Sequence, residues 1–314
     1  MVLTMKLKNY ISWLTVGLVA WLFWRALSSN WEQVRGLNIG LSYHAAAAVL
    51  LFAAAVIVSG ILWGYVFHKV AHVKVNVLEA VRAHCAAWVL KYIPGQVGAY
   101  VYKLDWGKKR GASKTATTLA FAYDMVFLTL ASTVVVIPIV LLGIGGDSHG
   151  SSLFLAYVII LTALFFATRK SLTRSVLLFI QKISGKKVAD TKVLDLKEVA
   201  QLSAWYLLPR VVNAFGFIMI AAAVVDVGLS AYVSLGAIYV LAGIVGIYAF
   251  FVPSGLGVRE GVIVLFASAY MSVEQAIVLS LLARLYATIA DGIVAITYVI
   301  ITKRTHEKVS LRVK

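Results

Sequence analysis

Long apolar runs separated by short polar segments dominate the chain. The runs lie at about 10–27, 39–67, 115–143, 152–168, 199–225 and 274–301. An α-helix needs roughly 20 predominantly apolar residues to cross a bilayer, and these runs are of that order. The pattern therefore predicts six membrane-spanning helices. In the second run, Gly60 and Gly64 are four residues apart, a spacing that lets helices pack closely.

Two further apolar segments, at about 76–104 and 231–270, carry a Pro-Gly break in the middle. The break is Pro94-Gly95 in the first segment and Pro253-Ser254-Gly255 in the second. Broken backbone at membrane depth is tolerated where it is buried in protein or lines a cavity. We therefore expect two re-entrant helical hairpins. The parity of the flanking helices places the opening of the first on the cytoplasmic side and that of the second outside.

The tips of the two predicted hairpins share a short motif. Ile93-Pro94-Gly95-Gln96-Val97-Gly98 matches Val252-Pro253-Ser254-Gly255-Leu256-Gly257. Past the tips the offset between the two halves changes from 159 to 160, and Asp124 then falls opposite Arg284. Repeats of this kind, inserted with opposite orientation, are typical of transporters whose sites lie near the bilayer midplane.

These patterns predict an all-α polytopic membrane protein with a single integral membrane domain over residues 1–314. A first repeat at about 39–143 and a second at about 199–301 form an inverted pair. Between them, about 169–198 reads as an amphipathic segment on the cytoplasmic membrane surface.

Composition and charge agree with this class. The chain is 61% hydrophobic and only 13% charged, whereas soluble domains carry about 25% charged residues. Its net charge of +16 comes from 29 Lys and Arg residues, most of which fall on one side of the predicted membrane. The positive-inside rule then predicts a multi-pass protein of the cytoplasmic membrane with both termini cytoplasmic. The sequence shows no basic face interleaved with aromatic residues, so we expect no nucleic-acid partner.

The sequence contains no evident catalytic residues. The single cysteine, Cys85, excludes an internal disulfide. We find no nucleophile–base pair, nucleotide-binding glycine loop or zinc motif. The sequence therefore predicts a protein that is not an enzyme and that uses no cofactor or metal.

Charged residues beside the hairpin tips are the candidate site. A Lys or Arg at the bilayer centre costs roughly 2.5–3.5 kcal/mol, so these residues need partners, an aqueous cavity or an anionic headgroup. Half-helix N-termini add partial positive charge. The candidate substrate-binding residues are Lys91, Tyr92, Pro94, Gly95, Gln96, Gly98, Lys103, Asp124, Arg210, Pro253, Ser254, Gly255, Gly257, Arg259, Glu260, Arg284 and Asp291.

The roles of the acidic candidates stay open at this point. Asp124 and Arg284 form either a structural ion pair between the halves or a gate or headgroup contact. Asp291 either pairs with Arg284 or Arg210 or carries protons. Arg259 and Glu260 are adjacent, and adjacent residues on a helix do not face each other, so we expect each to have a different partner.

At these residues the chain resembles the integral-membrane region of the lysylphosphatidylglycerol synthase family, also called the flippase-like domain family. The segments "KYIPGQVGAYVYK", "FFVPSGLGVREG" and "LLARLYATIADG" carry the resemblance, which covers nearly the whole chain. The family commonly has Arg where this chain has Lys103, and a Glu-Arg pair where it has Tyr123-Asp124. The resemblance implies lipid flipping between leaflets. We expect this chain to correspond to the translocating part alone, without the aminoacyl-transferase domain of the full synthases.

We therefore expect translocation of an anionic, aminoacylated or polyprenyl-phosphate-linked lipid through a midplane groove between the hairpins. The partners would be membrane lipids. The alternative is a non-catalytic scaffold that recruits a glycosyltransferase or lipid-modifying enzyme through basic cytoplasmic segments such as Lys108-Lys109-Arg110. A membrane-embedded lipid-modifying enzyme ranks last.

Overall fold

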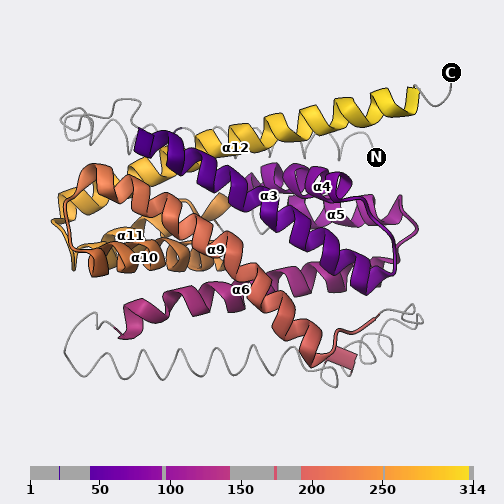
Figure 1. Ribbon diagram of the computed structural model, residues 1–314, viewed down its shortest axis with the longest axis horizontal. Helices are drawn as coiled ribbons and strands as arrows, with labels where there is room; N and C mark the ends of the chain where they lie inside the picture. Colours follow the sequence, from indigo (N-terminus) through magenta and orange to yellow (C-terminus); the bar gives the residue numbers. More distant parts are fainter. Residues whose placement is uncertain are drawn as a thin grey trace.

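The computed structural model describes residues 21, 43–93, 97–141, 173–174, 192–249 and 252–310. The predicted helices at 10–27 and 152–168 lie almost entirely outside these residues, as does most of the predicted surface segment at 169–198. Pro94, Gly95 and Gln96, the centre of the first tip, also lie outside them. Figure 1 shows that the described part is built of helices.

The first half of the described chain is a long helix, a broken pair of short helices and a second long helix. These elements are α3 (Tyr43–Ala71), α4 (Val77–Val89) with η1 (Leu90–Tyr92), α5 (Val97–Lys108) and α6 (Lys114–Leu141).

The second half repeats this order. Its elements are α9 (Leu196–Val224), α10 (Leu229–Tyr248), η3 (Pro253–Gly255), α11 (Val258–Ala267) and α12 (Val273–Ser310). Pro209 lies inside α9, and the helix continues through this proline. The order of a long helix, a helical hairpin and a long helix thus occurs twice among the described elements.

Five described helices are long and apolar enough to cross a membrane. They are α3, the Lys114–Ile137 part of α6, α9, α10 and the Val273–Lys303 part of α12. The protein is therefore an all-α, multi-pass membrane protein. By length and composition alone α10 also qualifies as a span, although the sequence analysis assigned it to one arm of the second hairpin.

Both hairpins are broken where the local chemistry requires it. Ile93, the residue before Pro94, is extended with φ −80° and ψ 124°. Proline disfavours the helical conformation in its predecessor, which ends the first arm. At the second tip, Ser254, Gly255 and Gly257 all have positive φ, a region that glycine enters without steric cost.

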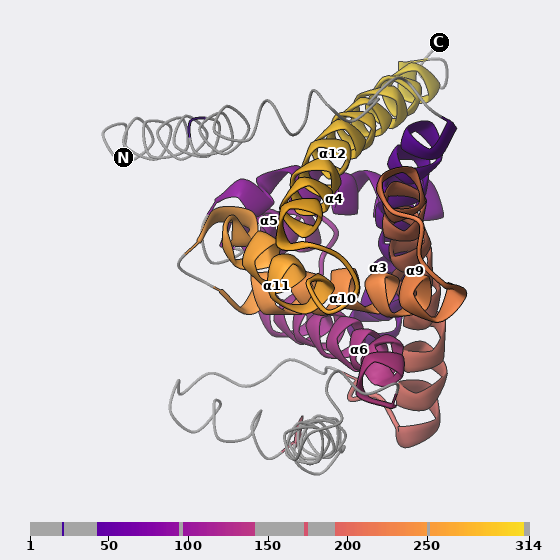
Figure 2. The same ribbon diagram turned by 90° about the vertical axis from the view of Figure 1, so that its left-hand side faces the viewer.

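The two hairpins approach each other from opposite ends of the molecule. In Figure 1, α4 and α5 occupy the right-hand half and α10 and α11 the left-hand half, and their tip elements η1 and η3 are in contact. Figure 2 looks along the bundle, with α12 above, α6 below and α3 and α9 along one side. In this view the long helices thus lie above, below and to one side of the two hairpins.

Two apolar cores support this arrangement. One joins α3, α9, α10 and α12 and contains Phe52 and Phe217, whose rings stack on Tyr239 at centroid distances of 5.1 and 4.8 Å. The other joins α3, α5, α6 and α9 around Trp63 and Trp106. Burial of such aromatic side chains dominates core energetics and fixes the long helices around the tips.

Close packing of α3 on α4 uses the predicted glycine pair. A Cβ atom added at Gly64 would lie 2.3 Å from Ala80 Cβ, and one at Gly60 would lie 3.0 Å from His84 Cβ. Small residues at both positions let the two backbones approach. This contact holds α4 closely against α3.

Candidate functional site

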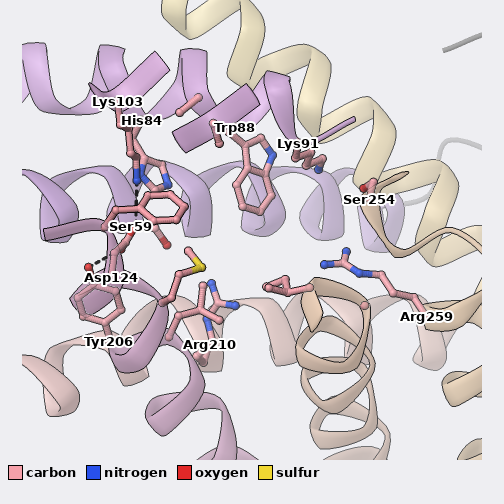
Figure 3. A pocket seen from close by; sticks show the side chains of 17 residues that line it. Ser59, His84, Trp88, Lys91, Lys103, Asp124, Tyr206, Arg210, Ser254 and Arg259 are labelled. Carbon is pink, nitrogen blue, oxygen red and sulfur yellow. Dashed lines mark hydrogen bonds and ion pairs between the residues drawn. The ribbon is translucent and has the colours of Figure 1, made fainter. Parts of the chain in front are cut away.

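Two adjoining cavities lie where the hairpin tips meet, each with a volume of about 70 Å³. Figure 3 shows the first cavity, whose wall comes from both hairpins and from α3, α6 and α9. The residues that line both cavities are Trp88, Lys91, Leu128, Arg210, Ile247 and Arg259.

Lys103 and Asp124 form a buried ion pair at one end of the first cavity. Lys103 Nζ on α5 lies 2.9 Å from Asp124 Oδ2 on α6, and the two side chains are 3% and 4% exposed. Tyr206 donates its hydroxyl to the other carboxylate oxygen at 2.6 Å. Lys103 Nζ also lies 4.4 Å from the centre of the Trp63 ring. The pair is therefore satisfied within the protein.

Asp291 on α12 receives three donors from the first hairpin. Lys91 Nζ lies 2.7 Å from Oδ2, and Trp88 Nε1 and the Tyr92 hydroxyl donate at 2.7 and 2.6 Å. The expected pairing of Asp291 with Arg284 or Arg210 is wrong, because the tip of the first hairpin brings Lys91 closer. This network ties η1 to the last helix of the second half.

Arg284 supports the second tip instead of pairing with Asp124. Its Nε lies 3.8 Å from Glu260 Oε1, and its Nη1 donates to the Ser254 carbonyl at 3.4 Å. Glu260 also accepts the Gly257 backbone N–H at 2.7 Å. The predicted Asp124–Arg284 ion pair is therefore wrong: each residue pairs with the preceding hairpin arm of its own half.

Arg210 and Arg259 lack carboxylate partners in the part of the chain that the structure describes. Both Nε atoms are buried there without a hydrogen bond. Arg259 makes one long contact, from Nη2 to the Gly243 carbonyl at 3.5 Å. As expected, Arg259 and the adjacent Glu260 have different partners. Figure 3 shows both guanidinium groups reaching toward the cavity space, Arg210 from α9 and Arg259 from α11.

The charges that line the cavities do not balance. Four cationic side chains (Lys91, Lys103, Arg210 and Arg259) face two acidic ones (Asp124 and Asp291), both of which are already paired. Among the described residues, two guanidinium charges therefore remain uncompensated in a largely apolar surrounding. Buried charge is costly unless it is paired, so this arrangement suits an anionic ligand.

Local sequence features place these two arginines. Pro209, immediately before Arg210, cannot donate to the carbonyl one turn earlier, which locally loosens the helix. Gly246 on α10 leaves room for Arg259, because a Cβ there would lie 2.6 Å from Arg259 Cγ. Gly255 at the tip packs on the same glycine, and its own Cβ would lie 2.6 Å from Gly246 Cα.

The other candidates have more peripheral positions. Tyr92 contacts Asp291, Ser254 lines the first cavity, and Gly257 is the N-cap residue of α11. Gly98 stands beside the first tip, where a Cβ would lie 2.9 Å from the Leu90 carbonyl. Pro253 belongs to η3, while Pro94, Gly95 and Gln96 lie outside the described residues.

Sequence reasoning did not single out the residues that satisfy the aspartates or complete the wall. Trp88 precedes Lys91 by three residues and Tyr206 precedes Arg210 by four, so each shares a helix face with its cation. The sequence signal that could have identified Trp88 and Tyr206 is an aromatic hydrogen-bond donor about one helical turn before a cation in an apolar segment. His84 also lines the cavity, is 8% exposed, and has no hydrogen-bond partner for Nδ1 among the described residues.

A family model described as the lysylphosphatidylglycerol synthase TM region matches residues 12–295. The match spans both hairpins, every cavity-lining residue and most of α12. A search of curated proteins found no match.

Proposed function

The chain belongs to the family of the lysylphosphatidylglycerol synthase TM region, which ties it to membrane lipids, and we propose that it translocates anionic lipids between the two leaflets. The proposal concerns the membrane region alone. No chemical conversion of the lipid is part of it.

The uncompensated charge of the cavities is the observation that carries this proposal. Arg210 and Arg259 have buried Nε atoms without partners in the part of the chain that the structure describes, and both line the two cavities where the hairpin tips meet. A lipid headgroup that crosses a bilayer needs polar partners on the way, because charged groups are costly in the hydrocarbon core. A headgroup phosphate would satisfy the guanidinium groups, while its acyl or prenyl tails stay in the surrounding lipid.

In this proposal the two broken hairpins form a groove at mid-depth. Opposed hairpins whose tips meet provide a passage that can open first to one side and then to the other. The Lys91–Asp291 contact crosses between the halves, so it would have to adjust when the hairpins move. The driving force would be the lipid gradient itself or a coupled ion gradient, with Asp124, Glu260 and Asp291 as charge partners.

The cytoplasmic membrane is the proposed location, with both termini on the cytoplasmic side. The distribution of Lys and Arg along the chain supports this orientation. The short helices α4 and α5 would then open toward the cytoplasm, and α10 and α11 toward the outside.

Leaflet exchange in proteoliposomes tests the function. Purified protein would be reconstituted with headgroup-labelled lipids that are anionic, zwitterionic, aminoacylated or polyprenyl-phosphate-linked. We expect exchange of an anionic class by the wild type, and a loss on the order of tenfold in the Arg259→Ala variant, because a charged hydrogen bond to the headgroup is removed. The matched control is Lys108→Ala, which removes an exposed cation on α5 away from the cavity.

Normal exchange by a folded Arg259→Ala protein would contradict the site. If the folded wild type moved none of the lipids, the translocase would be wrong. The scaffold hypothesis would then gain weight. It predicts instead that charge reversal at Lys108, Lys109 and Arg110 abolishes recruitment of a glycosyltransferase or lipid-modifying enzyme.

A further inference from the structure

We propose that the lipid headgroup bound between Arg210 and Arg259 is an unsubstituted phosphate monoester, which carries two negative charges. The inference rests on the proposed function and names the substrate class for the same site. It follows from the charges that line the cavities, from the cavity volumes, and from which lining side chains already have hydrogen-bond partners.

The charge of the cavities matches a dianion. Two guanidinium groups remain without carboxylate partners among the described residues. A phosphate monoester has a charge between about −1.5 and −2 near neutral pH, whereas a phosphodiester headgroup such as that of phosphatidylglycerol has one negative charge. A monoester therefore neutralises both arginines, and a diester leaves one of them uncompensated in a low-dielectric site.

Guanidinium geometry favours the same ligand. Arginine presents several N–H donors in a planar fork that binds phosphate oxygens in pairs. A monoester offers three terminal oxygens, one more than a diester. Arg210 reaches the cavity from α9 and Arg259 from α11, so the oxygens can be held from two sides (Figure 3).

The size of the cavities limits the headgroup. Each has a volume of about 70 Å³. On this measure a water molecule needs roughly 10–15 Å³, so one cavity has room for about as many atoms as a phosphate group. An aminoacyl-glycerol headgroup has several times as many non-hydrogen atoms and does not fit into either cavity as they stand.

A cationic headgroup would also lack a partner in this site. Asp291 already accepts from Lys91, Trp88 and Tyr92. Asp124 is held by Lys103 and Tyr206. An added ammonium group would meet two guanidinium charges that no described carboxylate compensates, and both aspartates of the described cavity walls are already paired.

Binding of two matched lipids tests the inference. The full chain in detergent would be titrated with dioctanoyl phosphatidic acid and with dioctanoyl phosphatidylmethanol, which differ only in the methyl ester that removes one charge. We expect phosphatidic acid to bind at least on the order of tenfold more tightly. Arg210→Gln and Arg259→Gln should each largely remove this preference, and Lys108→Gln, on the exposed end of α5, should keep it.

Equal affinity for the two lipids would overturn the assignment, as would a preference that survives in both arginine variants. Glycerol 3-phosphate provides a further arm: if it bound as tightly as phosphatidic acid, the ligand would be a soluble phosphate and the lipid assignment would be wrong. The test is separate from leaflet exchange. If the protein exchanged phosphodiester lipids but did not prefer the monoester, the proposed function would stand and this inference would be wrong. If it preferred the monoester in binding but exchanged no lipid, this inference would stand and the proposed function would be wrong.

Discussion

The buried charges at the hairpin tips divide into two kinds at the scale of single residues. Lys103 and Asp124 are satisfied by each other and by Tyr206. Arg210 and Arg259 are not satisfied by any carboxylate in the described residues. The charges of the first kind are neutralised within the protein, and those of the second kind are the ones that the proposed headgroup would neutralise. The sequence places all four in apolar surroundings but does not distinguish them, because the pairing depends on which helices the fold brings together.

Removal of one member of the Lys103–Asp124 pair should be costly. Asp124→Leu leaves the Lys103 ammonium group buried without a counter-charge, and breaking a buried pair in this way destabilises by about 3–5 kcal/mol. The double variant Lys103→Met/Asp124→Leu replaces both charges with apolar groups, and we expect it to recover most of this loss. The thermal unfolding of each purified variant in the same detergent measures the effect. A double variant that is less stable than either single variant would show that the pair has a further role.

At the scale of elements, glycine determines how closely the tip segments approach. Gly246 of α10 packs against both Gly255 of η3 and the Arg259 side chain of α11. The tip motif in the sequence indicated that Gly255 and Gly257 occupy a break, and both have positive φ as such a break requires. The importance of Gly246 could not be predicted in the same way, because its neighbours come from the other arm of the hairpin.

Gly246→Ala should displace Arg259 while leaving the fold intact. The added methyl group would lie 2.6 Å from Arg259 Cγ, and a flexible side chain can move away from such a contact. We expect lipid exchange to fall on the order of tenfold, comparable to a lost charged hydrogen bond, with little change in the unfolding temperature. Gly261→Ala is the control, since a Cβ at Gly261, an exposed position on α11 outside the cavity walls, meets no described atom within 4 Å. Equal exchange by the two variants would contradict the role of Gly246.

At the scale of the whole molecule, hydropathy and the tip motifs predicted the helical class, the positions of four long helices and the two broken hairpins. The observed bounds of α3, α6, α9 and α12 lie near the predicted runs. Ion-pair partners were predicted less well. Asp124 and Arg284 are aligned by the repeat, and the sequence analysis paired them across the halves. In the structure each contacts its own hairpin, Lys103 and Glu260 respectively, with the signs of charge exchanged between the halves.

The two pairs lie in comparable places because, in each half, the helix after the hairpin packs against the arm that precedes it. Their hairpin partners are not aligned by the repeat, since Lys103 falls opposite Val262 and not Glu260. A sequence alignment carries no information on this contact between elements. The orientation of the halves relative to the membrane is likewise a prediction, which rests on the distribution of Lys and Arg.

Cysteine labelling from one side of the membrane tests this orientation. The single native cysteine, Cys85, is fully buried, so its background reaction should be low. Lys108→Cys places a thiol at the open end of the first hairpin, and Ser230→Cys places one at the open end of the second; both positions are exposed. In right-side-out vesicles an impermeant maleimide should label Ser230→Cys at once and Lys108→Cys only after the membrane is permeabilised. Opposite accessibility of the two sites would support hairpins that enter from opposite faces, and equal accessibility before permeabilisation would rule out the inverted arrangement on which the proposed passage depends.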